Sequence, residues 1–110
     1  MSNMKHLLVM FDLPVTTKLE RKAANKFRKF LKSQGYCMMQ YSVYTRICDS
    51  VERKETHLRR LNAAVPPNGI VECIELTVAQ YENRHMYSNP HPSAKKKVHY
   101  ITNTDRVLCF

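Results

Sequence analysis

The stretch KHLLVMFDLP, residues 5–14, predicts the strand around which the rest of the chain folds. Residues 7–11 are all apolar, so both faces of a strand formed here are apolar, as in a strand buried on two sides. The run delivers one carboxylate, Asp12, and Pro14 stops it. These residues predict a central strand with a single acid at its tip, in a chain that is otherwise strongly basic.

The overall composition indicates one globular domain with a polyanionic partner. The chain has 110 residues, 44% of them hydrophobic, and a formal net charge of +9. A basic surface without a specific ligand is the open alternative. The four cysteines form no C-x-x-C pair and the five histidines show no ligand spacing, so neither zinc nor redox chemistry is indicated. No segment approaches the roughly 20 apolar residues of a membrane span, and we expect a cytoplasmic protein that does not contact membranes.

A strongly basic helix follows the first strand. Thr17 and Glu20 fit a capping box, which predicts a helix to about residue 33, just before Gly35. Its expected buried stripe is Leu19, Ala23, Phe27, Phe30 and Leu31. The remaining positions carry seven cations: Lys18, Arg21, Lys22, Lys26, Arg28, Lys29 and Lys32. We interpret them as a nucleic-acid-binding surface with salt-dependent affinity, in preference to an ordinary solvated helix face.

The middle of the chain predicts further strands and a second helix. Residues 36–47 are rich in aromatic and β-branched side chains and are interpreted as one long strand. A capping signal at 49–52 begins a helix that ends before the paired prolines at 66–67. Residues 70–76 predict a third strand, and a weak fourth strand is expected within 80–87.

The order of these elements indicates an α+β, ferredoxin-like sheet of the βαββαβ type with two helices on one face. Residues 1–87 form the domain, and residues 88–110 are interpreted as its C-terminal loop with short strands at 98–101 and 106–110. The last strand is expected to pair at a sheet edge of its own subunit or of a partner. A sheet with helices on one face leaves the other open, which predicts a homodimer through the sheet faces. The apolar residues expected outside the helix cover are Leu8, Met10 and Met38.

Asp12 is the first candidate for chemistry. A carboxylate at the end of a strand is well placed for metal binding or acid–base work, and Mg²⁺ takes one or two carboxylates and keeps several waters. One acid in each chain suffices if a dimer axis brings two copies of Asp12 to one ion. The alternative, equally supported by spacing alone, is a turn or capping residue before Pro14.

Three stretches together resemble one family. They are LLVMFDLP at 7–14, GYCMMQYSVYTRI at 35–47 and ELTVAQYENRHMY at 75–87. In this order they resemble the second of the two core CRISPR-associated adaptation proteins, the small basic partner of the CRISPR integrase. The resemblance extends over nearly the whole chain.

This resemblance implies a ferredoxin-like homodimer whose last strand, here residues 106–110, lies across the partner's sheet. It implies a nuclease dependent on Mg²⁺ or another divalent cation, acting on RNA or double-stranded DNA, with Asp12 as catalytic residue and metal ligand. It also implies a central dimer that holds a DNA duplex between integrase subunits. To this we add, as our own inference, three candidate supporting residues: Gln40, Ser42 and Tyr44.

Two other functions remain open from the sequence. One is a toxin ribonuclease of the virulence-associated D type, which has a related fold. The other is a non-catalytic RNA-binding module of the same fold, which would need exposed aromatic side chains on the sheet to stack bases. Tyr36 and Tyr44 are the candidates for such stacking.

Overall fold

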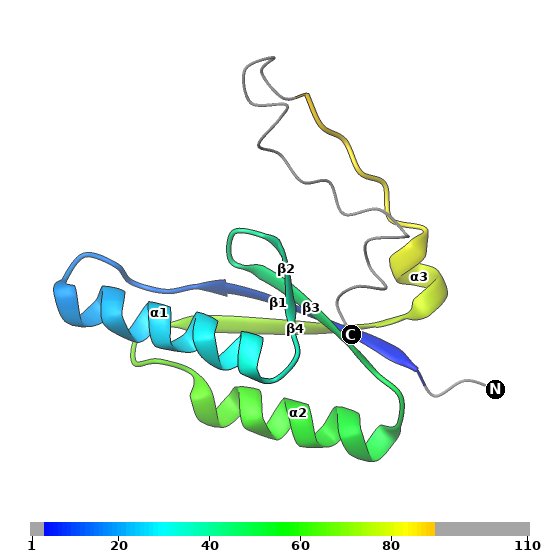
Figure 1. The fold of residues 1–110 in the computed structure, drawn as a ribbon, viewed down its shortest axis with the longest axis horizontal. Coiled ribbons are helices and arrows are strands. Elements are labelled where there is room, and N and C mark those ends of the chain that lie inside the picture. Colours follow the sequence, from blue (N-terminus) through cyan, green and yellow to red (C-terminus); the bar gives the residue numbers. More distant parts are fainter. Residues whose placement is uncertain (1–3, 90–110) are drawn as a thin grey trace.

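The computed structural model describes residues 4–89, and within them it confirms the predicted α+β, ferredoxin-like order (Figure 1). The elements are β1 (Lys5–Asp12), α1 (Lys18–Ser33), β2 (Cys37–Gln40), β3 (Val43–Cys48), α2 (Val51–Ala64), β4 (Ile70–Thr77) and α3 (Val78–Glu82). The strands predicted at 98–101 and 106–110 lie outside the described residues.

The four strands form one antiparallel sheet in the order β2-β3-β1-β4. β1 is central and pairs with β3 on one side and with β4 along its whole length on the other. Leu7 and Val9 of β1 are fully buried and share one core with Phe27 of α1 and Leu61 of α2. Both long helices therefore cover the same face of the sheet, as the sequence predicted.

α1 begins and ends as predicted, and Phe27, Phe30 and Leu31 of its predicted stripe pack on the core. Thr17 accepts a hydrogen bond from the Glu20 N–H at 3.1 Å, and the Glu20 carboxylate accepts one from the Thr17 N–H at 2.8 Å. The residues facing the core are Ala24, Phe27 and Leu31. The prediction that Leu19 is buried is wrong, because this residue is 79% exposed and lines a surface pocket with Leu13 and Pro67.

The predicted single strand at 36–47 is wrong, because it folds as the hairpin β2–β3. Tyr41 and Ser42 form its turn, and Ser42 adopts a φ of +69°. No glycine or Asn-Gly pair marks this turn, and positive φ is uncommon for a residue with a side chain. The long apolar and aromatic run therefore gave no signal that the chain reverses.

The weak strand predicted within 80–87 is also wrong. Residues Val78–Glu82 form the short helix α3, with Thr77 as N-cap. The Thr77 hydroxyl accepts from the Gln80 N–H at 3.0 Å, and the Gln80 side chain accepts from the Thr77 N–H at 2.9 Å. This is the same capping box that predicted α1, so the signal was present in the sequence.

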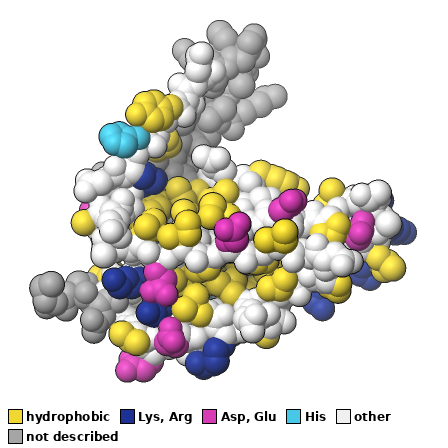
Figure 2. Space-filling view, turned by 180° about the vertical axis from the view of Figure 1, so that it is seen from behind, with side chains coloured by type: hydrophobic (Ala, Val, Ile, Leu, Met, Phe, Trp, Pro, Cys, Tyr) yellow, Lys and Arg dark blue, Asp and Glu magenta, His cyan; other side chains and the backbone are white. Residues whose placement is uncertain are grey.

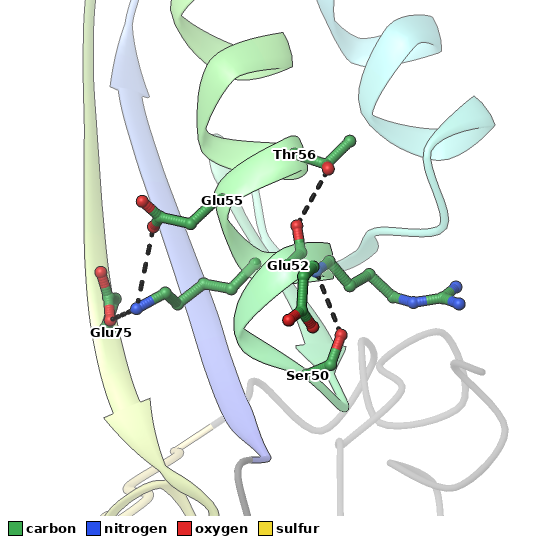
Figure 3. A network of polar contacts seen from close by, with 7 residues as sticks. Ser50, Glu52, Glu55, Thr56 and Glu75 are labelled. Atoms are coloured by element: carbon green, nitrogen blue, oxygen red, sulfur yellow. Dashed lines mark hydrogen bonds and ion pairs between the residues drawn. The ribbon is translucent and has the colours of Figure 1, made fainter.

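α2 is attached to the sheet by a polar network at its first turn (Figure 3). The Ser50 hydroxyl caps the helix by accepting from the Arg53 N–H at 3.1 Å. Lys54 donates to a Glu75 carboxylate oxygen of β4 at 3.1 Å and lies 3.8 Å from Glu55. The aliphatic stem of Lys54 is mostly covered, so this residue bridges helix and strand while its charge remains paired.

A buried imidazole between α2 and the sheet makes stability depend on pH. His57 is 5% exposed, its ring and that of Tyr36 meet edge to face, and its Nδ1 has no hydrogen-bond partner among residues 4–89. Burial, together with the smaller effect of the positive charges of Arg46, Arg60 and Arg53, lowers the pKa of His57 to about 4. The folded protein therefore keeps His57 neutral at pH values where the unfolded chain protonates it.

We expect the free energy of unfolding to fall as the pH drops from about 6.5 to about 4. The unfolded imidazole has a pKa near 6.5 and binds a proton first, which favours the unfolded state, and the loss from this group levels off below pH 4. With partial solvent screening we expect about 2 kcal/mol. Urea unfolding across this range should show a smaller loss for His57→Leu than for the wild type. The matched control, the exposed His85→Leu, should retain the wild-type slope.

Candidate functional site

Asp12 lies where the central strand leaves the core. It is the last residue of β1 and pairs with Ile70 of β4. By alternation along the strand it shares a face with Leu8 and Met10, on the side that α1 and α2 do not cover. The side chain is exposed and makes no hydrogen bond or ion pair with any of residues 4–89. It is therefore open to water and to a ligand.

Of the three candidate supporting residues, Ser42 lies nearest to this end of β1. Its carbonyl accepts a hydrogen bond from the N–H of Phe11, the residue before Asp12, at 3.1 Å. Gln40 is exposed on the edge strand β2, so β3 separates it from β1. The structure places Tyr44 elsewhere: it is 1% exposed, on the helix-covered face, with its ring centroid 5.7 Å from that of Phe11.

Burial also removes the aromatic platform that the RNA-binding alternative required. Tyr36 and Tyr44 are 3% and 1% exposed, so neither ring can stack on a base. Desolvation raises the pKa of both phenols, which keeps them neutral. These two side chains belong to the core.

The face of the sheet opposite the helices is apolar and, within residues 4–89, largely uncovered. Figure 2 shows hydrophobic side chains gathered across its middle, with carboxylates among them. Ile70 and Ile74 of β4 are 62% and 43% exposed. α3 covers one end, where the Tyr81 ring stacks on His6 with centroids 3.9 Å apart. An exposed apolar patch on a sheet is typical of a protein–protein interface.

The basic surface predicted on α1 is present on the side of the helix away from its buried stripe. Five of the seven cations line one shallow surface depression, together with Asn25: Lys18, Arg21, Lys22, Lys26 and Lys29. Lys32 is exposed in the last turn of the helix. The one acid of α1, Glu20, is held in the capping box and is not among the depression's lining residues. This surface therefore carries a concentrated positive charge.

Arg28 does not belong to this depression. Its guanidinium carbon lies 5.6 Å from the ring centroid of Phe11 and 4.4 Å from that of Tyr41. The prediction from sequence grouped Arg28 with the other cations of the helix and assigned no role to Tyr41. A helical projection, which puts Arg28 beside the buried stripe, was the available signal.

The donors of one chain fit a metal ion only in part. Within residues 4–89, no three His, Cys, Asp or Glu side chains come together as a ligand cluster. Asp12 supplies one open carboxylate, which meets the lower limit for a water-rich Mg²⁺ site. One chain alone therefore offers a single carboxylate at this position.

None of the described helices is both long and apolar enough to cross a bilayer.

Comparisons of the sequence with known proteins identify the family to which this chain belongs. Three relatives are each named CRISPR-associated endoribonuclease Cas2. That of Parvibaculum lavamentivorans is 44% identical over 81 residues, 74% of this chain and 80% of the relative. Those of Ligilactobacillus salivarius and Paracidovorax avenae are 43% and 47% identical, over 72% and 69% of this chain and 78% and 70% of their own lengths. Residues 4–84 match the family described as CRISPR associated protein Cas2, and the chain therefore belongs to that family.

Proposed function

We propose that this protein is a metal-dependent endonuclease that hydrolyses phosphodiester bonds of RNA or DNA as a cytoplasmic homodimer. The observation that carries the proposal is Asp12, an exposed carboxylate without a partner among residues 4–89, at the tip of an otherwise buried strand. The names of the relatives favour RNA as the substrate, since each is called an endoribonuclease. Family membership favours this function over that of a toxin ribonuclease.

Asp12 and the cations of α1 have separate roles in this reaction. A divalent ion, if bound here, would supply Lewis-acid activation of the phosphate and of water. Asp12 of each chain would hold that ion, and its exposure leaves space for water and for a phosphate. Lys22, Lys26 and Lys29 would hold neighbouring phosphates by charge.

The open sheet face supports the dimer on which this site depends. Leu8 and Met10 are half-buried, and Ile74, which pairs with Leu8, is 43% exposed. Asp12 follows on the same face, so two sheets packed face to face would bring the two carboxylates towards a common axis. Two carboxylates near each other repel, and a divalent cation between them relieves that repulsion.

A second function, scaffolding of DNA with the CRISPR integrase, is favoured by the basic surface of α1. Five cations gather there without an acid among the lining residues, and phosphate contacts of this kind do not depend on base sequence. Such a surface holds a duplex whether or not Asp12 cuts. We propose that both functions reside in the same dimer.

The test of the enzymatic proposal compares RNA and DNA as substrates of the purified wild-type protein. We expect cleavage in Mg²⁺ and none in EDTA, with activity restored when Mg²⁺ is returned in excess. Cleavage that is unchanged by EDTA would contradict the metal-dependent mechanism. Pull-down of the integrase subunit and an integration assay test the scaffold role separately.

The salt dependence of duplex binding tests the basic surface. Each lysine that contacts a phosphate releases counterions, which lowers the logarithm of the affinity by about 0.9 for each tenfold rise in salt. The triple substitution Lys22→Gln, Lys26→Gln, Lys29→Gln should therefore flatten the slope of log affinity against log salt by about 2 to 3. Fluorescence anisotropy with a labelled duplex measures this slope. The matched control, Arg59→Gln on α2, removes an exposed cation outside the surface and should leave the slope unchanged.

A further inference from the structure

We propose that Tyr41, supported by Arg28, is a stacking platform for one unpaired base of a single-stranded nucleic acid. The proposal deepens the nucleic-acid function proposed above by assigning a residue that selects unpaired bases. Tyr41 lies in the turn between β2 and β3, at the sheet end where β1 delivers Asp12.

Tyr41 combines high exposure with a fixed support. Its side chain is 71% exposed, and the guanidinium carbon of Arg28 lies 4.4 Å from its ring centroid. This distance is within the range of a cation–π contact, so one part of the ring is supported and the rest remains open. Among residues 4–89, the Tyr41 ring contacts Arg28, and its high exposure leaves ring surface available to a ligand.

Arg28 is held in position by rings rather than by ion pairs. Its guanidinium lies over Phe11 as well as Tyr41, and its buried Nε has no hydrogen-bond partner in the described part of the chain. Phe11 is in turn fixed in the core by an edge contact with Phe27, at a centroid distance of 5.1 Å. Through Arg28, the exposed Tyr41 ring is therefore packed against a residue of the core, Phe11.

The backbone of the turn fixes the position of the platform relative to Asp12. The Ser42 carbonyl accepts a hydrogen bond from the Phe11 N–H at 3.1 Å. Tyr41 directly precedes Ser42, and Asp12 directly follows Phe11. With about 3.8 Å between consecutive Cα atoms, the two functional residues lie near each other at one end of the sheet. The Asp12 side chain lies on the open face of the sheet and Tyr41 contacts Arg28 of α1, so the two residues share one end of the sheet but not one face.

The charge around the platform suits a phosphate backbone. Lys29 and Lys32 are exposed on α1 beside Arg28, and no Asp or Glu occurs between residues 21 and 48. Cations that follow the backbone, combined with an aromatic ring for the bases, are the usual means of binding single strands. In a duplex the faces of the bases are covered by stacking, so Tyr41 distinguishes single strands from duplexes.

The test uses Tyr41→Leu in an Asp12→Asn background with EDTA, so that cleavage plays no part in the measurement. Labelled single-stranded RNA, single-stranded DNA of the same sequence and a matched duplex are titrated by fluorescence anisotropy. Loss of one stacked base should weaken single-strand binding by about 5- to 100-fold. Duplex binding should change less than about twofold, and Tyr41→Phe, which keeps the ring, should bind like the parent.

Two further variants make the result specific. Tyr87→Leu removes another exposed tyrosine, outside the basic helix, and should leave binding unchanged. Arg28→Lys keeps the charge but removes the planar guanidinium, and it should produce part of the loss seen for Tyr41→Leu. A loss with both sugars shows that the ring binds the base alone, and a loss with one sugar supports the platform and assigns the strand to that type.

Three results would overturn the proposal: unchanged single-strand binding, an equal loss for the duplex, or a loss that accompanies dissociation of the protein in sedimentation. Because no arm measures cleavage, a protein without nuclease activity can still pass this test. Conversely, a failed platform leaves the metal-dependent cleavage test of the wild type unaffected.

Discussion

Asp12→Asn is expected to lower metal-dependent cleavage by about 100-fold or more while leaving the protein folded. Removal of groups that merely support a metal ligand costs 10- to 100-fold, and removal of the ligand charge itself costs at least as much. Asn has nearly the same shape as Asp, and the Asp12 side chain makes no hydrogen bond or ion pair with residues 4–89 that the change would break. The free energy of unfolding should therefore change by less than about 0.5 kcal/mol.

The measurement is the initial rate of cleavage of labelled RNA and DNA across a range of Mg²⁺ concentrations. Duplex binding at low salt serves as the internal check, since the cations of α1 are unchanged in the variant. The matched control is Asp49→Asn, another exposed aspartate, whose ion pair with Arg53 at 3.2 Å lies at the start of α2. Cleavage by Asp12→Asn at the wild-type rate would show that the nuclease site lies elsewhere.

The parts of the fold that the sequence predicted are those that local chemistry determines. The apolar run of β1 and the capping box of Thr17 each specify their element without help from distant residues. The β2–β3 turn could not be predicted in this way. Ser42 adopts a positive φ because the strands on either side pair with each other, and this pairing is not a local property of the sequence. The wrong prediction of a strand in place of α3 has another cause. The capping box at Thr77 was visible in the sequence, but it directly follows a strand and was not interpreted as the start of a helix.

The residues of the candidate site divide in the same way, into features that local sequence determines and contacts between distant residues. The position of Asp12 at the end of an apolar strand was predicted and is confirmed, whereas its role in a site stays a prediction. Tyr44 was misplaced because the hairpin puts it beside Val9, on the face that the helices bury. The contact of Arg28 with Tyr41 joins residues far apart in the sequence, so no local pattern could have shown it.

Ile74→Lys is expected to dissociate the proposed dimer. Ile74 pairs with Leu8 near the middle of the open sheet face and is 43% exposed in the single chain. Packed against a second sheet, a lysine at this position would bring an unpaired charge into an apolar interface. At a central interface position such a change costs about 2 kcal/mol or more, which raises the dimer dissociation constant by at least about 30-fold.

Sedimentation equilibrium at several protein concentrations measures this dissociation. Leu19→Lys adds the same charge to an exposed leucine on α1, away from the sheet face, and should sediment like the wild type. Because each chain contributes one Asp12, the Ile74→Lys monomer should also lose metal-dependent cleavage, although its own Asp12 is intact. Cleavage retained by a proven monomer would contradict the shared metal site, and a wild type that sediments as a monomer would contradict the dimer itself.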